Sequence, residues 1–148
     1  MRILLQRVSR ASVAVRGQLV AEIGPGLLLL VGVGRDDGFG EYDRVAEKVF
    51  NLRVFEDEQG KMNRSLADVG GEILVVPQFT LYGDVRKGRR PSWDGAAPPG
   101  IAEDRVEAFA KALEDRGATV KRGAFREHMR VELVNDGPVT LWIDAGGL

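Results

Sequence analysis

Residues 73–84 read ILVVPQFTLYGD. The first four residues form a short apolar run with the side chains that strands prefer. The residues from Pro77 to Asp84 then bring together proline, glycine, threonine and an amide side chain. Because irregular segments held at the ends of rigid strands often carry binding and catalytic groups, this stretch predicts a strand that leads into a functional loop.

A second unit of the same kind lies further along the chain. Residues 131–134 read VELV, and residues 135–140 read NDGPVT. Taken alone, a Gly-Pro pair usually marks a turn, and only about 5–6% of X-Pro bonds in folded proteins are cis. The position of Gly137 and Pro138 directly after a predicted strand makes this loop the second candidate site.

The composition indicates one globular domain that spans residues 1–148. Hydrophobic residues make up 44% of the chain and charged residues 29%, which is an ordinary balance for a soluble domain able to bury a core. The longest uninterrupted apolar run, residues 27–31, is too short to cross a bilayer, and no signal peptide precedes it. We therefore expect a cytoplasmic protein without a membrane partner.

Several kinds of chemistry are excluded by the residues that are missing. The chain has no cysteine and a single histidine, His128. Disulfides, thiol nucleophiles, cysteine-ligated zinc and a multi-histidine metal site within one subunit are therefore excluded. The glycines at 24, 26, 32 and 34 also lack the spacing of a phosphate-binding loop. We expect no metal and no cofactor.

Positive charge is concentrated directly after the first candidate loop. The net charge is −1, which argues against general binding to nucleic acids, and no DNA partner is expected. Four cationic residues nevertheless fall within five positions: Arg86, Lys87, Arg89 and Arg90. Such a patch suits phosphate contacts, which add affinity without reading sequence. A solvated surface turn is the alternative interpretation.

The order of predicted elements indicates an α/β fold. Strand patterns cover residues 1–8, 11–15, 19–23, 27–33 and 71–79, with further strands between 119 and 143. Residues 16–18 read as a hairpin loop, and residues 55–62 as a turn or hairpin. Helical spacing predicts amphipathic helices over residues 39–54 and 101–116, while residues 65–69 stay ambiguous. We expect a mixed, barrel-like sheet covered by two main helices.

Thr80 is the most conspicuous hydroxyl in the first loop. As a nucleophile it would need an adjacent base, and the sequence offers no local histidine. Thr80 would otherwise contact a substrate or satisfy backbone groups of its own loop. Consecutive backbone N–H groups of Gln78, Phe79 and Thr80 would also suit a developing oxyanion, where one lost donor typically costs ~10²–10³ in rate.

Together the two loops resemble the signature of the D-aminoacyl-tRNA deacylases, the D-Tyr-tRNA deacylase family, whose motifs read close to SQFTL and NxGPVT. The similarity extends to residues 1–8 (MRILLQRV), 24–34 (GPGLLLLVGVG), 87–92 (KGRRPS) and 141–144 (LWID). The first motif departs from the family pattern at one position, because Pro77 stands where the family usually has serine. Proline offers neither a hydroxyl nor a backbone N–H, so any role of that serine is absent here.

The resemblance implies roles for both loops. It implies a compact α/β domain that dimerises and a catalytic loop, Gln78 to Thr80, that binds the 3′-terminal adenosine of a charged tRNA. It also implies that Gly137 and Pro138 form a Gly-cisPro element. Two carbonyl oxygens of that element would enter the partner's pocket, accept from the substrate amine and exclude an L side chain. Such proofreading works by rejection.

A third segment resembles the surroundings of the family's adenine pocket. Phe125 and Met129 match its aromatic and thioether positions, where a base could stack. The small Gly-Ala pair expected between them is replaced by Arg126 and Glu127. Packing of both side chains in the core is the alternative. We expect His128 to lie at the surface, and Trp93 and Trp142 to serve packing rather than binding.

The resemblance therefore implies an enzyme that hydrolyses the ester bond of D-aminoacyl-tRNA and of glycyl-tRNA mischarged on tRNA-Ala. It also implies a homodimer with composite active sites. Its expected partners are a second copy of the chain and the acceptor end of an aminoacyl-tRNA. Two other functions stay open from the residues alone. One is an inactive dimeric module that binds tRNA ends, and the other is a small-ester hydrolase that uses Thr80.

Overall fold

The structure is a computed structural model that describes residues 1–38 and 40–148. Its main sheet contains six strands: β1 (Arg2–Val15), β2 (Gln18–Ile23), β3 (Gly26–Gly32), β6 (Glu72–Pro77), β7 (Thr119–Arg122) and β8 (Arg130–Asp144). A separate hairpin pairs β4 (Phe55–Glu56) with β5 (Met62–Arg64). The helices are α1 (Glu41–Asn51), α2 (Leu66–Val69) and α3 (Pro99–Asp115), with 3-10 helices η1 (Phe79–Tyr82) and η2 (Ala145–Gly147).

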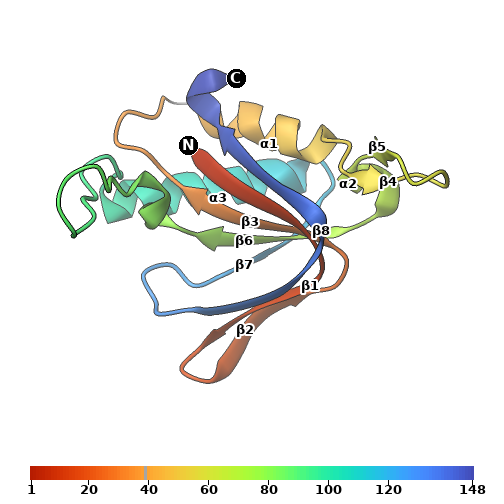
Figure 1. The fold of residues 1–148 in the computed structure, drawn as a ribbon, viewed down its shortest axis with the longest axis horizontal. Helices are drawn as coiled ribbons and strands as arrows, with labels where there is room; N and C mark the ends of the chain where they lie inside the picture. The colour runs from red at the N-terminus through yellow and green to blue at the C-terminus, as the bar shows by residue number, and fades with distance from the viewer. Residues whose placement is uncertain (39) are drawn as a thin grey trace.

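Strand β1 organises the sheet because it has neighbours on both sides along its length. Its first half pairs with β3, its second half pairs with β2, and β8 runs antiparallel beside it throughout. β3, β6 and β7 then pair in parallel. The sheet is therefore mixed, as predicted, and it bends along β1 into a partly closed barrel (Figure 1).

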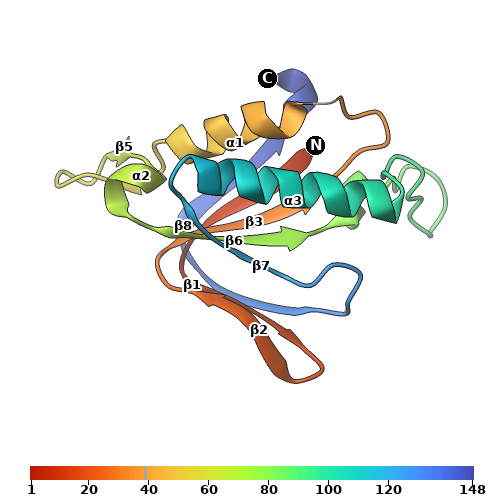
Figure 2. The same cartoon turned by 180° about the vertical axis from the view of Figure 1, so that it is seen from behind.

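Apolar side chains fill two cores, one on each face of the central strands. In β3 and β6, alternate residues such as Leu29 and Val75 face α1 and α3, whereas Leu28 and Leu74 face the inside of the curved sheet. Strands buried on both faces read as continuous apolar runs, which explains the unbroken LLLLV and ILVV segments. Each fully buried aliphatic side chain contributes about 1.5–3 kcal/mol of hydrophobic stabilisation. Figure 2 shows α1 and α3 together on one side of the sheet.

Most predicted elements are present, and several of their boundaries differ. The strands expected over 1–8 and 11–15 are one strand, because β8 keeps pairing past the exposed Ser9 and Arg10. The strand expected to reach Phe79 ends at Pro77 and continues as η1. The first helix covers 41–51 rather than 39–54, and residue 39 lies outside the described residues. The second begins at Pro99, two residues earlier than expected.

Local signals explain the smaller elements. Arg16 and Gly17 both have positive φ, 49° and 76°, as a two-residue type I′ hairpin turn requires. The ambiguous segment 65–69 is the short helix α2, which Ser65 and Asp68 begin with a reciprocal capping box. None of the helices within residues 1–38 and 40–148 is long and apolar enough to cross a membrane.

Candidate functional site

The first candidate loop is fixed to β3 at its start. The backbone N–H of Gln78 donates to the carbonyl of Val31 at 2.7 Å, and Gly83 closes η1 with a 2.9 Å bond to Thr80. Two glycines allow this close approach. A Cβ on Gly32 would lie 2.8 Å from the Gln78 carbonyl, and one on Gly34 would lie 2.7 Å from the Tyr82 ring. Gly32 and Gly34 lack the spacing of a phosphate-binding loop, and their place beneath the first candidate loop is a role that no local sequence pattern indicates.

Within the loop, Thr80 is exposed and its hydroxyl accepts a hydrogen bond from the side-chain amide of Gln78. An amide cannot remove a proton as a base would, so this contact does not activate Thr80 as a nucleophile. Phe79 is 55% exposed and packs edge-to-face on Trp93, with ring centroids 5.3 Å apart. The loop thus presents an aromatic pair and a hydroxyl–amide pair.

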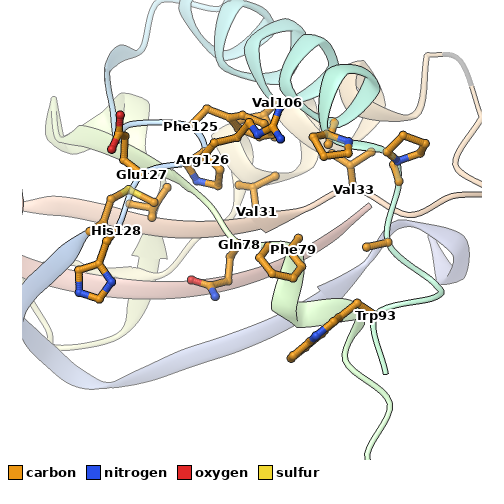
Figure 3. A pocket seen from close by; sticks show the side chains of 18 of the residues that line it. Val31, Val33, Gln78, Phe79, Trp93, Val106, Phe125, Arg126, Glu127 and His128 are labelled. Carbon is orange, nitrogen blue, oxygen red and sulfur yellow. The ribbon is translucent and has the colours of Figure 1, made fainter. Parts of the chain in front are cut away.

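A pocket of about 780 Å³ lies beside this loop. Gln78 and Phe79 line it together with Phe125 and Met129, so the structure brings the predicted loop and the predicted adenosine segment to one cavity (Figure 3). A volume in this range accommodates a small-molecule ligand or a nucleoside with its substituent. Figures 1 and 2 agree that the loops after β6 and after β7 meet at the same end of the molecule.

Trp93 also lines this pocket and is 41% exposed. Trp93 packs against Phe79, as predicted, and its ring also forms a wall of the pocket. A side chain on Gly83 would approach the Trp93 ring to 2.7 Å, so that glycine is needed for the stacking. Trp142 is 52% exposed, and the Arg2 guanidinium lies 5.8 Å from its ring centroid. Trp142 thus packs at the surface against Arg2 and lies outside the buried core.

The segment between β7 and β8 closes one end of the pocket. Gly123 donates a 2.8 Å backbone bond to Val75 and leaves room for Met129, whose sulfur would lie 3.0 Å from a Cβ at that glycine. Phe125 and Met129 are partly buried, whereas Arg126, Glu127 and His128 are exposed and line the pocket. His128 thus lies at the surface, as predicted.

The Gly-Pro loop is a wide bulge in β8. Gln6 pairs with Thr140 and Val8 pairs with Asn135, so four residues, 136–139, stand opposite the single residue Arg7. The Gly137-Pro138 peptide bond is cis, and both residues are exposed. Neither lines the pocket described above. Within one subunit, the structure therefore does not bring Gly137 and Pro138 to the pocket beside the predicted catalytic loop.

Arg7 and Asn135 hold the base of this bulge. Arg7 is 5% exposed and donates 2.7 Å hydrogen bonds to the carbonyls of Asp136 and Val54. The Asn135 amide donates to the carbonyls of Arg7, at 2.9 Å, and Val139, at 3.1 Å. Sequence reasoning missed Arg7, although strand alternation puts it on the buried side with Ile3 and Leu5, where an arginine needs specific partners.

The cationic segment forms a loop that is closed at its neck. Asp84 and Ser92 exchange two backbone hydrogen bonds of 2.8 and 2.9 Å. Arg86 folds back on Asp84, with nitrogen–oxygen distances of 2.6–3.0 Å. Those hydrogen bonds lower the pKa of the Asp84 carboxyl to about 2. In the part of the chain that the structure describes, Lys87, Arg89 and Arg90 have no such ion pair, and none of the four cations lines the pocket.

The C-terminal end of η1 contacts the first residue of β1, Arg2. Arg2 donates to the Leu81 carbonyl at 3.0 Å, and its guanidinium lies 4.4 Å from the centroid of the Tyr82 ring. The Tyr82 hydroxyl contacts Asp37 at 3.4 Å. Burial of the ring, followed by the charge of Asp37, raises the pKa of the Tyr82 phenol well above its ordinary value. Tyr82 is therefore a neutral anchor for η1.

Among the described residues, no group of three or more histidine, aspartate or glutamate side chains is placed to hold a metal ion.

Comparisons with known proteins agree on one family. The model of D-Tyr-tRNA(Tyr) deacylase matches residues 4–144. A D-aminoacyl-tRNA deacylase of Heliobacterium modesticaldum is 59% identical over 147 residues, which cover 99% of this chain and 98% of the relative. The protein of the same name from Thermomicrobium roseum is 60% identical over 148 residues, covering 100% and 96%.

Two solved structures have the same fold. The c-Myc DNA unwinding element binding protein superposes with a TM-score of 0.91 at 41% identity, covering 97% of this chain and 98% of its own. A probable eukaryotic D-amino acid tRNA deacylase gives 0.73 at 19% identity, covering 96% and 97%. The second likeness bears on the fold alone.

Proposed function

The chain belongs to the D-Tyr-tRNA(Tyr) deacylase family, and we propose that its active site is divided between the two subunits of a homodimer. The enzyme is a D-aminoacyl-tRNA deacylase, a hydrolase of the ester between a D-amino acid and tRNA. Family membership favours this reaction over the inactive RNA-end binder and over the small-ester hydrolase that the residues alone left open.

The observation that carries the assignment of roles is the shared pocket. In the proposed complex, the terminal adenosine enters between Phe125 and Met129, where a base can stack on an aromatic ring. The aminoacyl ester then reaches Gln78 and Phe79, which line the same cavity. Thr80, beside them in η1, contacts the substrate through its hydroxyl or its backbone.

In the proposed mechanism, water attacks the ester carbonyl carbon. The carbonyl oxygen takes up negative charge, which the backbone N–H groups of Phe79 and Thr80 stabilise. Collapse of this intermediate breaks the bond to the ribose oxygen, which leaves as a hydroxyl after taking up a proton. The neighbouring ribose hydroxyl and water carry the proton transfers, because the Thr80 hydroxyl is hydrogen-bonded to an amide and not to a base.

Gly137 and Pro138 act, in this proposal, on the pocket of the partner subunit. Two features support the idea: the bulge is exposed, and Arg7 and Asn135 fix it from within its own subunit. A rigid, exposed bulge can exclude an L side chain from a neighbouring pocket and accept the substrate amine through its carbonyls. Glycine, which has no side chain, would also be hydrolysed, including glycine mischarged on tRNA-Ala.

Exposed apolar residues near the bulge support a second copy of the chain as the partner. Val134 is 42% exposed, Leu141 37% and Trp142 52%, and all three belong to β8. Large apolar side chains grouped on one strand favour burial in an interface.

Incubation with D-tyrosyl-tRNA and L-tyrosyl-tRNA tests the reaction. Release of D-tyrosine alone is expected. Release of neither amino acid, or of both at equal rates, would contradict the proposed selectivity.

Mixing two inactive variants tests the division of the site. Phe79→Ala damages the pocket and Gly137→Ala damages the bulge, so each homodimer should be inactive. In a mixed dimer, one site receives both defects and the other receives neither. Random mixing should therefore restore about a quarter of the wild-type sites in a two-fold symmetric dimer. If pocket and bulge act within one subunit, mixing restores nothing.

A further inference from the structure

Arg126 is a cation at the pocket for which the described residues provide no partner. It lines the cavity next to Phe125, and Figure 3 shows both at one end, with Trp93 at the other. Within residues 1–38 and 40–148, no ion pair or side-chain hydrogen bond involves its guanidinium. The neighbouring Glu127, by contrast, is paired with Arg16 at 3.0 Å. The carboxylate nearest in sequence is thus already paired, and Arg126 contributes a positive charge without an ion pair to this end of the pocket.

The backbone at Arg126 supports a functional role. Its φ is 63°, in the left-handed region that side chains with a Cβ rarely adopt. Its neighbours in the loop are fixed, because Gly123 is bonded to Val75 and Met129 fills the space beside Gly123. A glycine would suit this backbone better. An arginine kept in such a conformation at a pocket is the kind of outlier that motivates a functional hypothesis.

The chemical nature of the group that Arg126 would bind follows from the proposed function, on which this inference rests. If the terminal nucleoside occupies the pocket with its base near Phe125, its phosphodiester leaves beside the segment that carries Phe125. The planar guanidinium of arginine matches phosphate oxygens and can donate two parallel hydrogen bonds. We propose that Arg126 binds the phosphodiester that joins the terminal nucleoside to the rest of the RNA.

This phosphate site is separate from the cationic loop at 86–90. That loop does not line the pocket, and Arg86 is already bound by Asp84. Its free cations can contact only RNA that lies outside the pocket. Arg126 therefore acts on the phosphate nearest the ester, where its contact also helps to position the reacting carbonyl.

The test compares two non-hydrolysable ligands that differ in phosphate. One is a short RNA whose 3′-terminal adenosine carries D-tyrosine through an amide, and the other is the same aminoacylated adenosine without phosphate. Arg126→Gly removes the cation and relieves the left-handed backbone, so folding should be preserved. Roughly tenfold weaker binding of the RNA is expected, with a salt dependence reduced by about 0.7 in slope. Binding of the nucleoside ligand should not change.

Two further variants test whether the loss of RNA binding comes from the Arg126 guanidinium itself. Arg126→Lys keeps the charge and should restore the salt slope, although not the full affinity. Lys48→Gln removes one exposed charge from α1, away from the pocket lining, and should leave binding of both ligands unchanged. Equal losses for both ligands, or no loss for the RNA, would overturn the inference.

Hydrolysis of D-tyrosyl-tRNA is measured separately on the wild-type protein. If the wild type binds the RNA ligand through Arg126 but does not hydrolyse the ester, the phosphate site stands and the proposed function fails. If the wild type hydrolyses the ester while Arg126→Gly binds the RNA normally, the proposed function stands and the phosphate site fails. If the wild type binds neither ligand, both are overturned.

Discussion

The guanidinium of Arg7 donates a 2.7 Å hydrogen bond to the carbonyl of Asp136, the residue that precedes Gly137. A second bond of the same length reaches the carbonyl of Val54. A single buried side chain from β1 thus fixes the bulge of β8 and joins it to the segment before β4. This relationship makes Arg7 the structural support of the Gly137-Pro138 bulge, which is proposed to exclude L side chains.

Replacement of Arg7 should therefore affect both folding and selectivity. Arg7→Ala removes two charge-assisted hydrogen bonds and should lower the free energy of unfolding by about 3 kcal/mol, since each such bond contributes about 1.5–3 kcal/mol. Arg7→Lys keeps the charge but cannot serve both carbonyls in the same geometry. Urea unfolding and the D/L ratio of hydrolysis measure the two effects. Arg10→Ala, an exposed change on the same strand, should alter stability by less than about 0.5 kcal/mol.

Gly137→Ala should abolish most hydrolysis of D-aminoacyl-tRNA. A Cβ at this position would collide with the Asn135 side-chain oxygen and lie 2.9 Å from the Val139 nitrogen. The bulge would have to shift, and a misplacement of about 1 Å in a catalytic constellation can cost 10²-fold in rate. Gly147→Ala is the matched control, because a Cβ there meets nothing within 4 Å. Equal rates for the two variants would show that the bulge does not act on the substrate.

Thr80→Ala should retain measurable single-turnover hydrolysis. The Thr80 hydroxyl is hydrogen-bonded to the Gln78 amide, so we expect it to position the substrate and not to form an acyl-enzyme. Rapid-quench measurements with D-tyrosyl-tRNA give the rate, and mass spectrometry of the quenched protein detects any adduct. A covalent aminoacyl group trapped on Thr80 would refute this role.

The cationic loop should contact RNA through three of its four charges. Asp84 binds Arg86, whereas Lys87, Arg89 and Arg90 have no ion pair among the described residues. Changing Lys87 and Arg89 to alanine should weaken tRNA binding and flatten its salt dependence by about one to two units of slope. Arg86→Ala should have the smaller effect. If the double variant keeps the wild-type slope, the loop is a solvated turn.

Tyr82 should titrate only well above pH 10. Burial first, and then the charge of Asp37, raises the pKa of its phenol in the folded protein, while the unfolded value is about 10. The neutral Tyr82 phenol therefore makes its full contribution to the free energy of unfolding below about pH 10. This contribution is lost as the pH rises further towards the pKa of the folded state. The chain has two tyrosines, so Tyr42→Phe leaves Tyr82 as the one observed by absorbance at 295 nm. Phenolate formation near pH 10 without unfolding would contradict this prediction.

The sequence predicted the elements whose signal is local. The three- and four-residue spacing of Val45, Ala46 and Val49 indicated α1, and these side chains are buried as that spacing requires. The exposed Ser9 and Arg10 suggested a turn, and the strand continues there only because residues 130–135, more than a hundred positions away, pair with it. No local pattern contains that information.

In the candidate site, too, the features with a local sequence signal were predicted, and those that depend on distant contacts were not. Both loops were identified from their own residues, and Gln78, Phe79, Phe125 and Met129 line one pocket. The pocket role of Trp93 and the support from Arg7 were missed, because each depends on a contact with a distant segment. The cationic loop separates Trp93 from Phe79 in the sequence, and most of the chain separates Arg7 from Asp136.

The pairing of β1 with β8 has a consequence for how the enzyme matures during synthesis. Asn135 bonds to Arg7 across 128 positions of sequence, and such non-local contacts form late because a long chain segment must first be ordered. On the ribosome, Arg7 and the pocket residues of β3, β6 and η1 are therefore synthesised well before the bulge that Arg7 holds. The support thus waits for its bulge, and the bulge, together with the nearby pocket residues Phe125 and Met129, can be completed only when the C-terminal strand is made.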